Sequence, residues 1–229
     1  MRFTYQHPRA ALTVDCVVFG FDDDALKVLL IRRGIQPYQN RWALPGGFVR
    51  PEETLDAAAR RELQEETGLR EIYLEQLYTF GAITRDPRER VVSVAYFALV
   101  RRAEHLPLAA TDAAEAAWYE VEAVPKLAFD HAEILALALV RLRGKIRWQP
   151  VGFELLPKNF TLTQFQALYE AILGRALDKR NFRKKLLALE LLVPLDEFTT
   201  VASRRPAQLF RFDHPKYQTL TRQGFIFDL

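Results

Sequence analysis

The strongest constraint on how this chain folds is a glutamate-rich stretch, GFVRPEETLDAAARRELQEETGL, at residues 47–69. We call it the glutamate segment. Thr54 is suited to cap the start of a helix, and Gly68 is suited to end one in the left-handed conformation. Asp56 would sit in the first turn, where the helix dipole favours an acid. The segment therefore predicts one helix between Thr54 and Gly68.

The predicted helix carries three carboxylates on one face, because Glu62, Glu65 and Glu66 stand at i, i+3 and i+4. Like charges at this spacing cost about 0.2–0.5 kcal/mol per pair. Arg61 can pair with Glu65 at i+4, but one arginine does not neutralise three acids. A solvated, charged helix face is one explanation. A bound Mg²⁺ or Mn²⁺ ion is the other, since Mg²⁺ is commonly held by one or two carboxylates together with substrate phosphates.

The spacing in the glutamate segment resembles the signature of the Nudix hydrolases: Gly, five residues, Glu, seven residues, then Arg-Glu-aliphatic-x-Glu-Glu-x-Gly-aliphatic. The matching positions are Gly47, Glu53, Arg61, Glu62, Leu63, Glu65, Glu66, Gly68 and Leu69. The resemblance implies an α/β fold, the Nudix α/β/α sandwich with a mixed sheet. It also implies metal-dependent hydrolysis of a diphosphate.

The first two thirds of the chain contain strand-like and helix-like patterns. Apolar runs rich in β-branched and aromatic residues predict strands, and an amphipathic run predicts a second helix. The predicted strands are 12–21, 26–33, 42–49, 72–83, 91–100 and 116–124, and the predicted helix is 129–143. Strands flanking two helices agree with the α/β/α layering, and we predict that this domain covers residues 1–148.

Composition is that of a soluble globular protein, with 49% hydrophobic and 27% charged residues. No run approaches the eighteen apolar residues typical of a membrane-spanning helix, so we expect no membrane association. The single cysteine, Cys16, lies in a predicted core strand, which excludes an internal disulfide and suits a reducing cytoplasm. We therefore predict a cytoplasmic protein in which Cys16 has a packing role.

The last part of the chain is more basic than the rest. Residues 151–229 hold 12 Lys and Arg against 8 Asp and Glu, whereas the net charge of the whole chain is only +3. The patterns predict a helix at 161–173 capped by Thr161, a break at Gly174, a helix at 176–192 capped by Asp178, and a hairpin of 198–203 with 207–213. This order predicts a winged helix-turn-helix domain at residues 149–229.

The second of these helices carries five cations within seven residues: Lys179, Arg180, Arg183, Lys184 and Lys185. Such charges repel one another, so contact with the phosphates of operator DNA explains them better than the alternative, a solvated basic face on a small dimerisation domain. Arg204 and Arg205, at the turn of the predicted hairpin, are expected to contact the DNA backbone or minor groove.

A Nudix domain followed by LDKRNFRKKL and a wing resembles the NrtR group of Nudix-related transcriptional regulators over nearly the whole chain. The resemblance implies a homodimer that binds a palindromic operator in front of NAD-metabolism genes and is released by ADP-ribose or a similar ligand. Two alternatives stay open: a hydrolase with an accessory winged helix, and a branch of the family that senses a sugar such as arabinose. Because the glutamate segment is intact, we favour a repressor that retains some diphosphate hydrolysis.

A second stretch, RDPRERVVSVAYFAL at 85–99, resembles ADP-ribose pyrophosphatase domains. It places Arg85, Arg88 and Arg90 in a predicted loop, where cations could meet a diphosphate. A solvated turn is the competing explanation of these arginines.

The resemblance also implies roles for the glutamates. Glu62, Glu65 and Glu66 would hold one to three Mg²⁺ or Mn²⁺ ions, which lower the pKa of a bound water. Glu53 would support the metal site, and Arg61 would orient a glutamate. The candidates for the general base are Glu65, Glu66 and three acids of the 101–116 loop, namely Glu104, Asp112 and Glu115.

Residues around the glutamate segment are candidates for ligand binding. Gly46 and Gly47 allow the backbone to approach metal and phosphates closely. Tyr38, Trp42 and Phe48 would line a nucleoside pocket or, alternatively, lie in the core.

Overall fold

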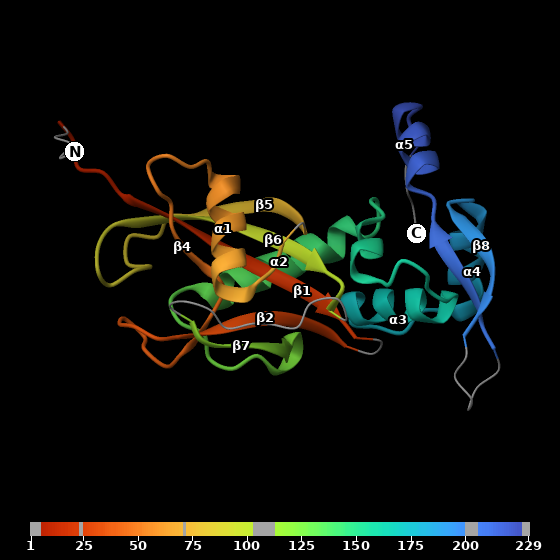
Figure 1. The fold of residues 1–229 in the computed structure, drawn as a ribbon, viewed down its shortest axis with the longest axis horizontal. Coiled ribbons are helices and arrows are strands. Elements are labelled where there is room, and N and C mark those ends of the chain that lie inside the picture. Colours follow the sequence, from red (N-terminus) through yellow and green to blue (C-terminus); the bar gives the residue numbers. More distant parts are fainter. Residues whose placement is uncertain (1–5, 23–24, 71, 103–112, 200–205, 226–229) are drawn as a thin grey trace. The chain divides into compact units, whose positions relative to one another are not determined.

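The structure is a computed structural model that describes residues 6–22, 25–70, 72–102, 113–199 and 206–225 (Figure 1). The chain divides into two compact units. One consists mainly of residues up to Ala138, and the other mainly of residues from Leu139 onward. The predicted domain boundary near residue 148 stays a prediction.

One sheet of seven strands organises the first unit, in the order β3-β2-β1-β6-β5, with β4 paired to β1 and β7 paired to β2. The strands are β1 (Ala11–Phe21), β2 (Leu26–Arg33), β3 (Trp42–Ala43), β4 (Gly46–Phe48), β5 (Tyr73–Phe80), β6 (Val91–Val100) and β7 (Ala113–Glu120). β1 lies between β2 and β6 and is buried on both faces from Thr13 to Phe21. This agrees with its nearly continuous apolar sequence, because a strand covered on both sides cannot alternate with polar residues.

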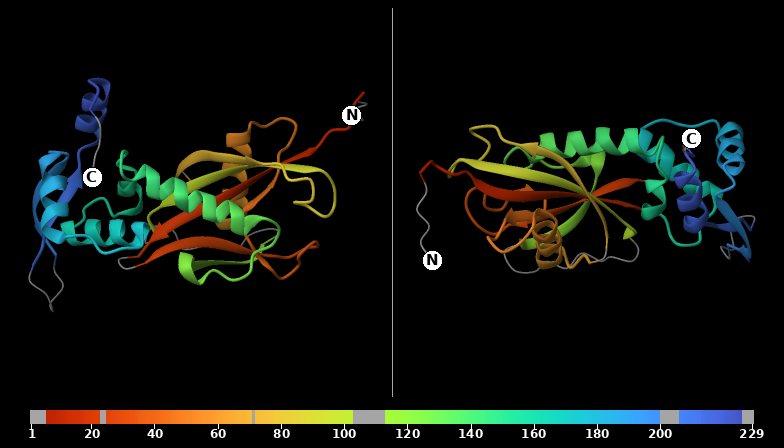
Figure 2. Two further views of the ribbon diagram at one scale, coloured as in Figure 1. Left: turned by 180° about the vertical axis from the view of Figure 1, so that it is seen from behind. Right: turned by 90° about the horizontal axis from the view of Figure 1, so that it is seen from above.

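Two helices cover opposite faces of this sheet (Figure 2). They are α1 (Leu55–Thr67) and the first half of α2 (His131–Lys145). On one face, Val14, Cys16 and Val18 of β1 pack in one cluster with Ala58, Ala59 and Leu63 of α1. In the second helix, α2, the side chains of Ile134, Leu135 and Ala138 are buried. The predicted α/β/α sandwich is confirmed, and Cys16 is fully buried in its core.

Helix α1 begins and ends where its sequence predicts. The Thr54 hydroxyl oxygen accepts a hydrogen bond from the Ala57 backbone N–H at 3.2 Å. Gly68 ends the helix with φ 76°, a left-handed conformation that favours glycine. The capping residues at its two ends are therefore sufficient to predict that Glu62, Glu65 and Glu66 lie in one helix.

The strand predicted at 42–49 is instead two short strands, β3 and β4, separated by Leu44 and Pro45. Proline has no backbone N–H and therefore interrupts a strand ladder. Its carbonyl still accepts from the Cys16 N–H at 2.8 Å, which holds the bend against β1. Smaller differences are that β5 ends at Phe80 and that a short 3-10 helix, Val121–Ala123, follows β7.

The second unit contains α3 (Leu162–Leu173), α4 (Lys179–Ala188), β8 (Leu192–Phe198), β9 (Gln208–Phe212) and α5 (His214–Arg222), preceded by a 3-10 helix, Val151–Leu155. Both predicted caps are present. The Thr161 side chain accepts from Gln164 N, and the Asp178 side chain accepts from Asn181 N. Gly174 lies between the two helices with φ 66°.

Aromatic side chains form the core of this unit. Phe165 of α3 packs against Phe153, Phe160, Tyr169 and Phe182, with ring centroids 4.7–5.8 Å apart. The predicted apolar stripe of α3 (Phe165, Leu168, Tyr169 and Ile172) is buried throughout. Aromatic pairs at these distances stabilise a small core beyond the area they bury.

The first strand of the hairpin lies earlier in the chain than predicted, whereas the second, predicted at 207–213, is Gln208–Phe212. Helix α4 ends at Ala188, and the first hairpin strand is Leu192–Phe198, not 198–203. Pro194 belongs to this strand and pairs with Phe210, which is tolerated because each strand of a two-stranded ladder is an edge strand. Arg204 and Arg205 lie outside the described residues. Helix α5 was not predicted, although Asp213 as its cap and Pro215 in its first turn are local signals for it.

Within the described part of the chain, no helix is both long and apolar enough to cross a membrane.

Candidate functional site

A cavity of about 200 Å³ lies in the first unit, lined by residues of β1, β2, β4 and α1 and of the loops before β6 and before α2. Its charged lining residues are Asp15, Arg33, Glu62, Glu66, Arg85, Asp86 and Arg88. A cavity that combines carboxylates with arginines suits a ligand that carries phosphates, held partly through a metal and partly through direct contacts.

Two glutamates of α1, Glu62 and Glu66, face this cavity and are almost fully buried. The Gly46 backbone N–H donates to Glu66 Oε2 at 2.8 Å. A Cβ added at Gly47 would lie 2.3 Å from Glu62 Oε1, so only glycine allows this carboxylate to rest against β4. The two predicted glycines therefore position the glutamate side chains as well as leave room for a ligand.

The surroundings of these two carboxyl groups disfavour the ionised form. Burial raises the pKa of Glu66 to about 8, and the nearby charges of Glu62 and Asp15 contribute in the same direction. Burial likewise raises the pKa of Glu62. Carboxylates kept apart from water in this way are good ligands for a hard divalent cation, which would favour their ionised form.

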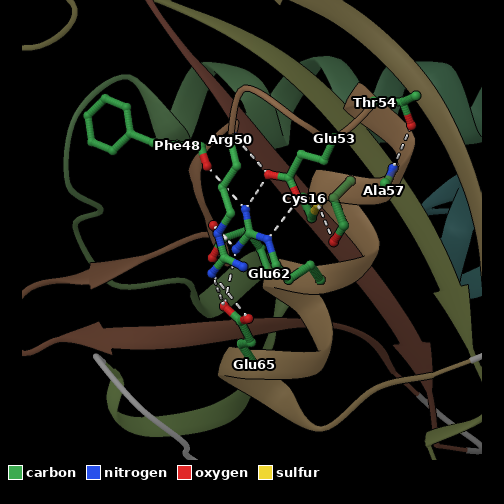
Figure 3. A network of polar contacts seen from close by, with 10 residues as sticks. Cys16, Phe48, Arg50, Glu53, Thr54, Ala57, Glu62 and Glu65 are labelled. Atoms are coloured by element: carbon green, nitrogen blue, oxygen red, sulfur yellow. Dashed lines mark hydrogen bonds and ion pairs between the residues drawn. The ribbon is translucent and has the colours of Figure 1, made fainter. Parts of the chain in front are cut away.

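Arg61 forms ion pairs with three acids of the glutamate segment, Glu53, Glu62 and Glu65. Figure 3 labels these three acids. Its guanidinium donates to Glu53 at 2.6 and 2.9 Å, to Glu62 at 2.6 Å and to Glu65 at 3.1 Å. Hydrogen bonds from Arg61, and then one from the Arg50 backbone, lower the pKa of Glu53 to about 2. Arg61 thus connects Glu53 to Glu62 by hydrogen bonds, and the roles expected of these residues stay predictions.

Glu65 is the one predicted metal ligand that does not line the cavity. Its carboxylate contacts Arg61 and, at 3.4 Å, Arg50 Nη2 (Figure 3). As the side chains lie, no three His, Cys, Asp or Glu residues among those described converge to hold a metal. Glu62 and Glu66 nevertheless fit Mg²⁺, because this ion commonly takes one or two carboxylates and completes its shell with water and substrate phosphates.

Arg85 is buried and paired with two carboxylates, so it is not the free cation that the loop suggested. Its guanidinium donates to Asp130 at 2.7 and 2.9 Å and to Asp15 at 3.1 Å. Asp15 also accepts from the Ser93 hydroxyl. Sequence reasoning missed Asp15 and Asp130. A charged residue within the apolar run 12–21 was the available signal, because buried charges require partners.

His131, also missed, joins this network at the start of α2. Its Nδ1 accepts from the Leu44 N–H at 2.9 Å, and its Nε2 lies 3.4 Å from Asp15 Oδ1. Burial lowers the pKa of His131, so the ring is neutral at pH 7 with its proton on Nε2. The network therefore links β1, the β3–β4 bend and α2 beneath the cavity.

The other predicted ligand residues have different positions. Arg88 lines the cavity and lies over the Phe48 ring, 5.2 Å from its centroid, while Asp86 accepts from it at 2.7 Å. Arg90 instead donates to the carbonyls of Gly81 and Ala82, which closes the loop. Tyr38 and Trp42 do not line the cavity. Tyr38 packs on Phe129, and Trp42 packs on Tyr119.

For the general base, Glu66 is the candidate whose position is best suited, since it lines the cavity. Glu115 lies on β7 and faces Arg32 at 3.7 Å, outside the cavity lining. Glu104 and Asp112 are outside the described residues.

On α4 of the second unit, the predicted DNA-binding cations differ in exposure. Phe182 and Leu186 are buried, and Arg180 and Lys184 lie on the opposite, exposed side at i and i+4. Lys179 and Lys185 are also exposed. Arg183 is half-buried, and its Nη2 donates to the Thr163 hydroxyl of α3 at 2.9 Å. Two like charges on one helix face favour an anionic partner.

Stability of the metal-free protein should depend on the Glu66 carboxyl. Its pKa is about 8 in the folded chain and about 4.3 when unfolded, so its contribution is present at low pH and is lost as the pH rises towards about 8. We expect the melting temperature in EDTA to fall less between pH 5 and pH 8 for Glu66→Gln than for the unmodified protein. At pH 8 the free energy of unfolding of Glu66→Gln should exceed that of the unmodified protein, relative to their difference at pH 5, by on the order of 2–5 kcal/mol. Glu65→Gln, on the same helix, is the control, and parallel curves for all three proteins would contradict the prediction.

Comparison with known proteins identifies a domain family for each of the two parts of the chain. The sequence matches the NUDIX domain over residues 9–138 and the NrtR DNA-binding winged helix domain over residues 152–212. The ADPR responsive transcriptional repressor NtrR of Acinetobacter baylyi is 40% identical over 211 residues, which are 90% of this chain and 83% of that protein. The ADP-ribose pyrophosphatase of Methanocaldococcus jannaschii is 40% identical over 131 residues, 57% of this chain and 73% of that protein.

Solved structures agree. Shewanella oneidensis NrtR, complexed with a 27mer DNA, has a TM-score of 0.77 at 33% identity and covers 88% of this chain and 93% of its own. The NUDIX domain of the same protein, complexed with ADP ribose, has a TM-score of 0.51 at 34% identity and covers 59% of this chain and 90% of its own. The chain belongs to the Nudix family and, within it, to the NrtR group of Nudix-related regulators, in which a winged helix domain follows the NUDIX domain.

Proposed function

We propose that this protein is a DNA-binding transcriptional repressor of NAD-related metabolism whose NUDIX domain binds ADP-ribose. The observation that carries the proposal is similarity to the Acinetobacter baylyi repressor across both parts of the chain. The likeness to Shewanella oneidensis NrtR, solved with DNA and with ADP ribose, supports both partners. A homodimer on a palindromic operator, in the cytoplasm, is part of the proposal, because one small winged helix contributes few base contacts.

The cavity suits the diphosphate of ADP-ribose, which links the adenosine to the terminal ribose. At about 200 Å³ it is smaller than the sites that enclose whole ligands of this size, which measure roughly 300–1,000 Å³. We therefore place the diphosphate near Gly46, Gly47 and Arg88 and the rest of the ligand towards the exposed Phe48 ring. Arg85, Arg90 and Tyr38 would act behind this surface, by holding the loops and the wall of the cavity.

We also propose that the protein retains metal-dependent hydrolysis of ADP-ribose. Glu62 and Glu66 would hold Mg²⁺ or Mn²⁺, with Glu65 recruited if its contacts to Arg50 and Arg61 open. When bound, the metal would neutralise the diphosphate and lower the pKa of a water molecule. Glu53 and Arg61 orient Glu62. The pKa of about 8 applies to Glu66 in the metal-free protein. A metal held by Glu62 and Glu66 would favour the ionised carboxylate, the form that can accept a proton. The likeness to the Methanocaldococcus jannaschii pyrophosphatase supports this part of the proposal.

The test is a gel shift on the DNA upstream of the protein's own gene, with and without ADP-ribose. We expect the protein to shift this DNA and saturating ADP-ribose to weaken binding about 5- to 150-fold, the usual range of allosteric coupling. Arabinose and AMP are the comparison ligands. Release by arabinose alone would favour the sugar-sensing branch. Cleavage of ADP-ribose without any DNA shift would favour a hydrolase with an accessory winged helix.

A further inference from the structure

One cation in the cavity wall is not used by the site described so far. Arg33 lines the cavity at the end of β2. Its Nε donates to the Pro37 carbonyl at 2.8 Å. Within the described residues, its two terminal nitrogens make no hydrogen bond or ion pair, in contrast to the nitrogens of Arg85 and Arg88, which face carboxylates.

The backbone holds Arg33 in place. Its N–H donates to the Arg41 carbonyl at 2.9 Å, and its carbonyl accepts from the Asn40 N–H at 2.8 Å. The pairing of β2 with β7 shifts register between Arg32 and Arg33, so alternation along the strand does not fix these two side chains. The cavity lining separates them, because it includes Arg33 and not Arg32. Arg32 is exposed and faces Glu115 at 3.7 Å. Arg33 therefore lines the cavity from the end of β2, where its backbone is hydrogen-bonded to Asn40 and Arg41.

Arg33 and Arg88 share one aromatic ring. Their guanidinium carbons lie 4.9 Å and 5.9 Å from the centroid of Phe129, which itself lines the cavity. Phe129 has φ 50°, in the left-handed region that a bulky residue rarely adopts and that is often found at ligand sites. Stacking on a ring leaves the edge of each guanidinium free to donate to an anion in a second direction.

The two arginines also repel each other. Burial lowers the pKa of Arg33, and the charge of Arg88 lowers it further. The charges of Glu66, Asp86 and Asp15 offset part of this repulsion, but none of these carboxylates accepts a hydrogen bond from Arg33 among the described residues. The terminal nitrogens of Arg33 can therefore donate to a bound anion.

We propose that Arg33 and Arg88, packed on Phe129, form an anion subsite that binds a phosphate group of a nucleoside diphosphate without the help of metal. The inference rests on the proposed function only in naming ADP-ribose as that diphosphate. Arg33 supplies most of the directional contact, because Arg88 already donates to Asp86. The subsite separates ligands with a diphosphate from those that present only a nucleoside or a sugar.

The experiment is calorimetric titration in EDTA of the full chain with ADP-ribose and, separately, with inorganic diphosphate. Arg33→Gln should bind both at least about tenfold more weakly, since hydrogen bonds to charged groups are among the stronger ones. Arg33→Lys should keep most of the affinity, because it retains the charge although it loses the Nε bond to Pro37. Arg32→Gln, the same change on the neighbouring residue, should bind as the unmodified protein does.

Equal affinity of Arg33→Gln and unmodified protein would overturn the subsite while leaving ADP-ribose as the effector. Equal losses in Arg33→Gln and Arg33→Lys would also overturn it, since they would reflect loosening of the 33–41 turn and not loss of charge. If ADP-ribose does not bind but inorganic diphosphate does, in a manner that depends on Arg33, the subsite stands and the proposed effector is wrong. Binding of neither ligand by the unmodified protein overturns both.

Discussion

Replacing Arg180 and Lys184 together by alanine is expected to weaken operator binding at least about a hundredfold at physiological salt. Both side chains lie on the exposed face of α4, opposite the buried Phe182 and Leu186. If both contact phosphates, the salt dependence of binding should flatten by about two units of slope, one for each lost contact. If one of them reads a base edge instead, the slope should fall by about one, and discrimination between operator and random DNA should drop as well. Fluorescence anisotropy over a range of salt concentrations measures both quantities.

The matched control is Lys158→Ala, an exposed cation of the same unit that lies outside α4. It should leave affinity and slope nearly unchanged. Arg183→Ala is expected to differ from both, because it removes the hydrogen bond to Thr163 that joins α3 and α4 and so should lower the melting temperature. Operator binding by the Arg180→Ala, Lys184→Ala protein at the affinity of the unmodified protein would refute α4 as the recognition helix.

Replacing Glu66 by glutamine is expected to make the repressor more sensitive to ADP-ribose when Mg²⁺ is present. Glu66 lines the cavity with Glu62, and its loss should reduce hydrolysis by about 10²- to 10⁴-fold, the range for a residue in general acid–base catalysis. Protein that cannot clear the ligand should release operator DNA at a lower total ADP-ribose concentration. Hydrolysis would thus act as a timer on the signal. In EDTA the two proteins should respond alike.

Operator release and ADP-ribose consumption can be followed in the same sample, by anisotropy and by chromatography of the nucleotides. Glu52→Gln, the same change at an exposed position of the glutamate segment, should behave as the unmodified protein. A ligand shifts a DNA-binding equilibrium only by as much as it prefers one conformation. Operator affinity that saturating ADP-ribose leaves unchanged in both proteins would therefore exclude it as the effector, and a sugar ligand would be tested next.

The sequence was most informative where structure depends on neighbours along the chain. Caps and left-handed glycines act within one helical turn, so α1, α3 and the start of α4 follow from Thr54, Gly68, Thr161, Gly174 and Asp178. Pairing between strands is less local. Pro194 lies between the predicted helix 176–192 and the predicted strand 198–203, but its pairing with Phe210 on β9 makes it part of a strand. Whether Pro194 lies in a strand therefore depends on its pairing partner, Phe210, sixteen residues further along the chain.

The sequence by itself determined the family, the order of the two domains and the helix that carries Glu62 and Glu66, because periodicity and spacing within the glutamate segment are sufficient for these. Only the tertiary structure decided which charges are available to a ligand. Arg85 is paired with Asp15, 70 positions away, and with Asp130, 45 positions away. Arg33 lines the same cavity, and its terminal nitrogens make no hydrogen bond among the described residues. Burial and partners of this kind set the pKa and the free donors of a side chain, and contacts between distant segments create both.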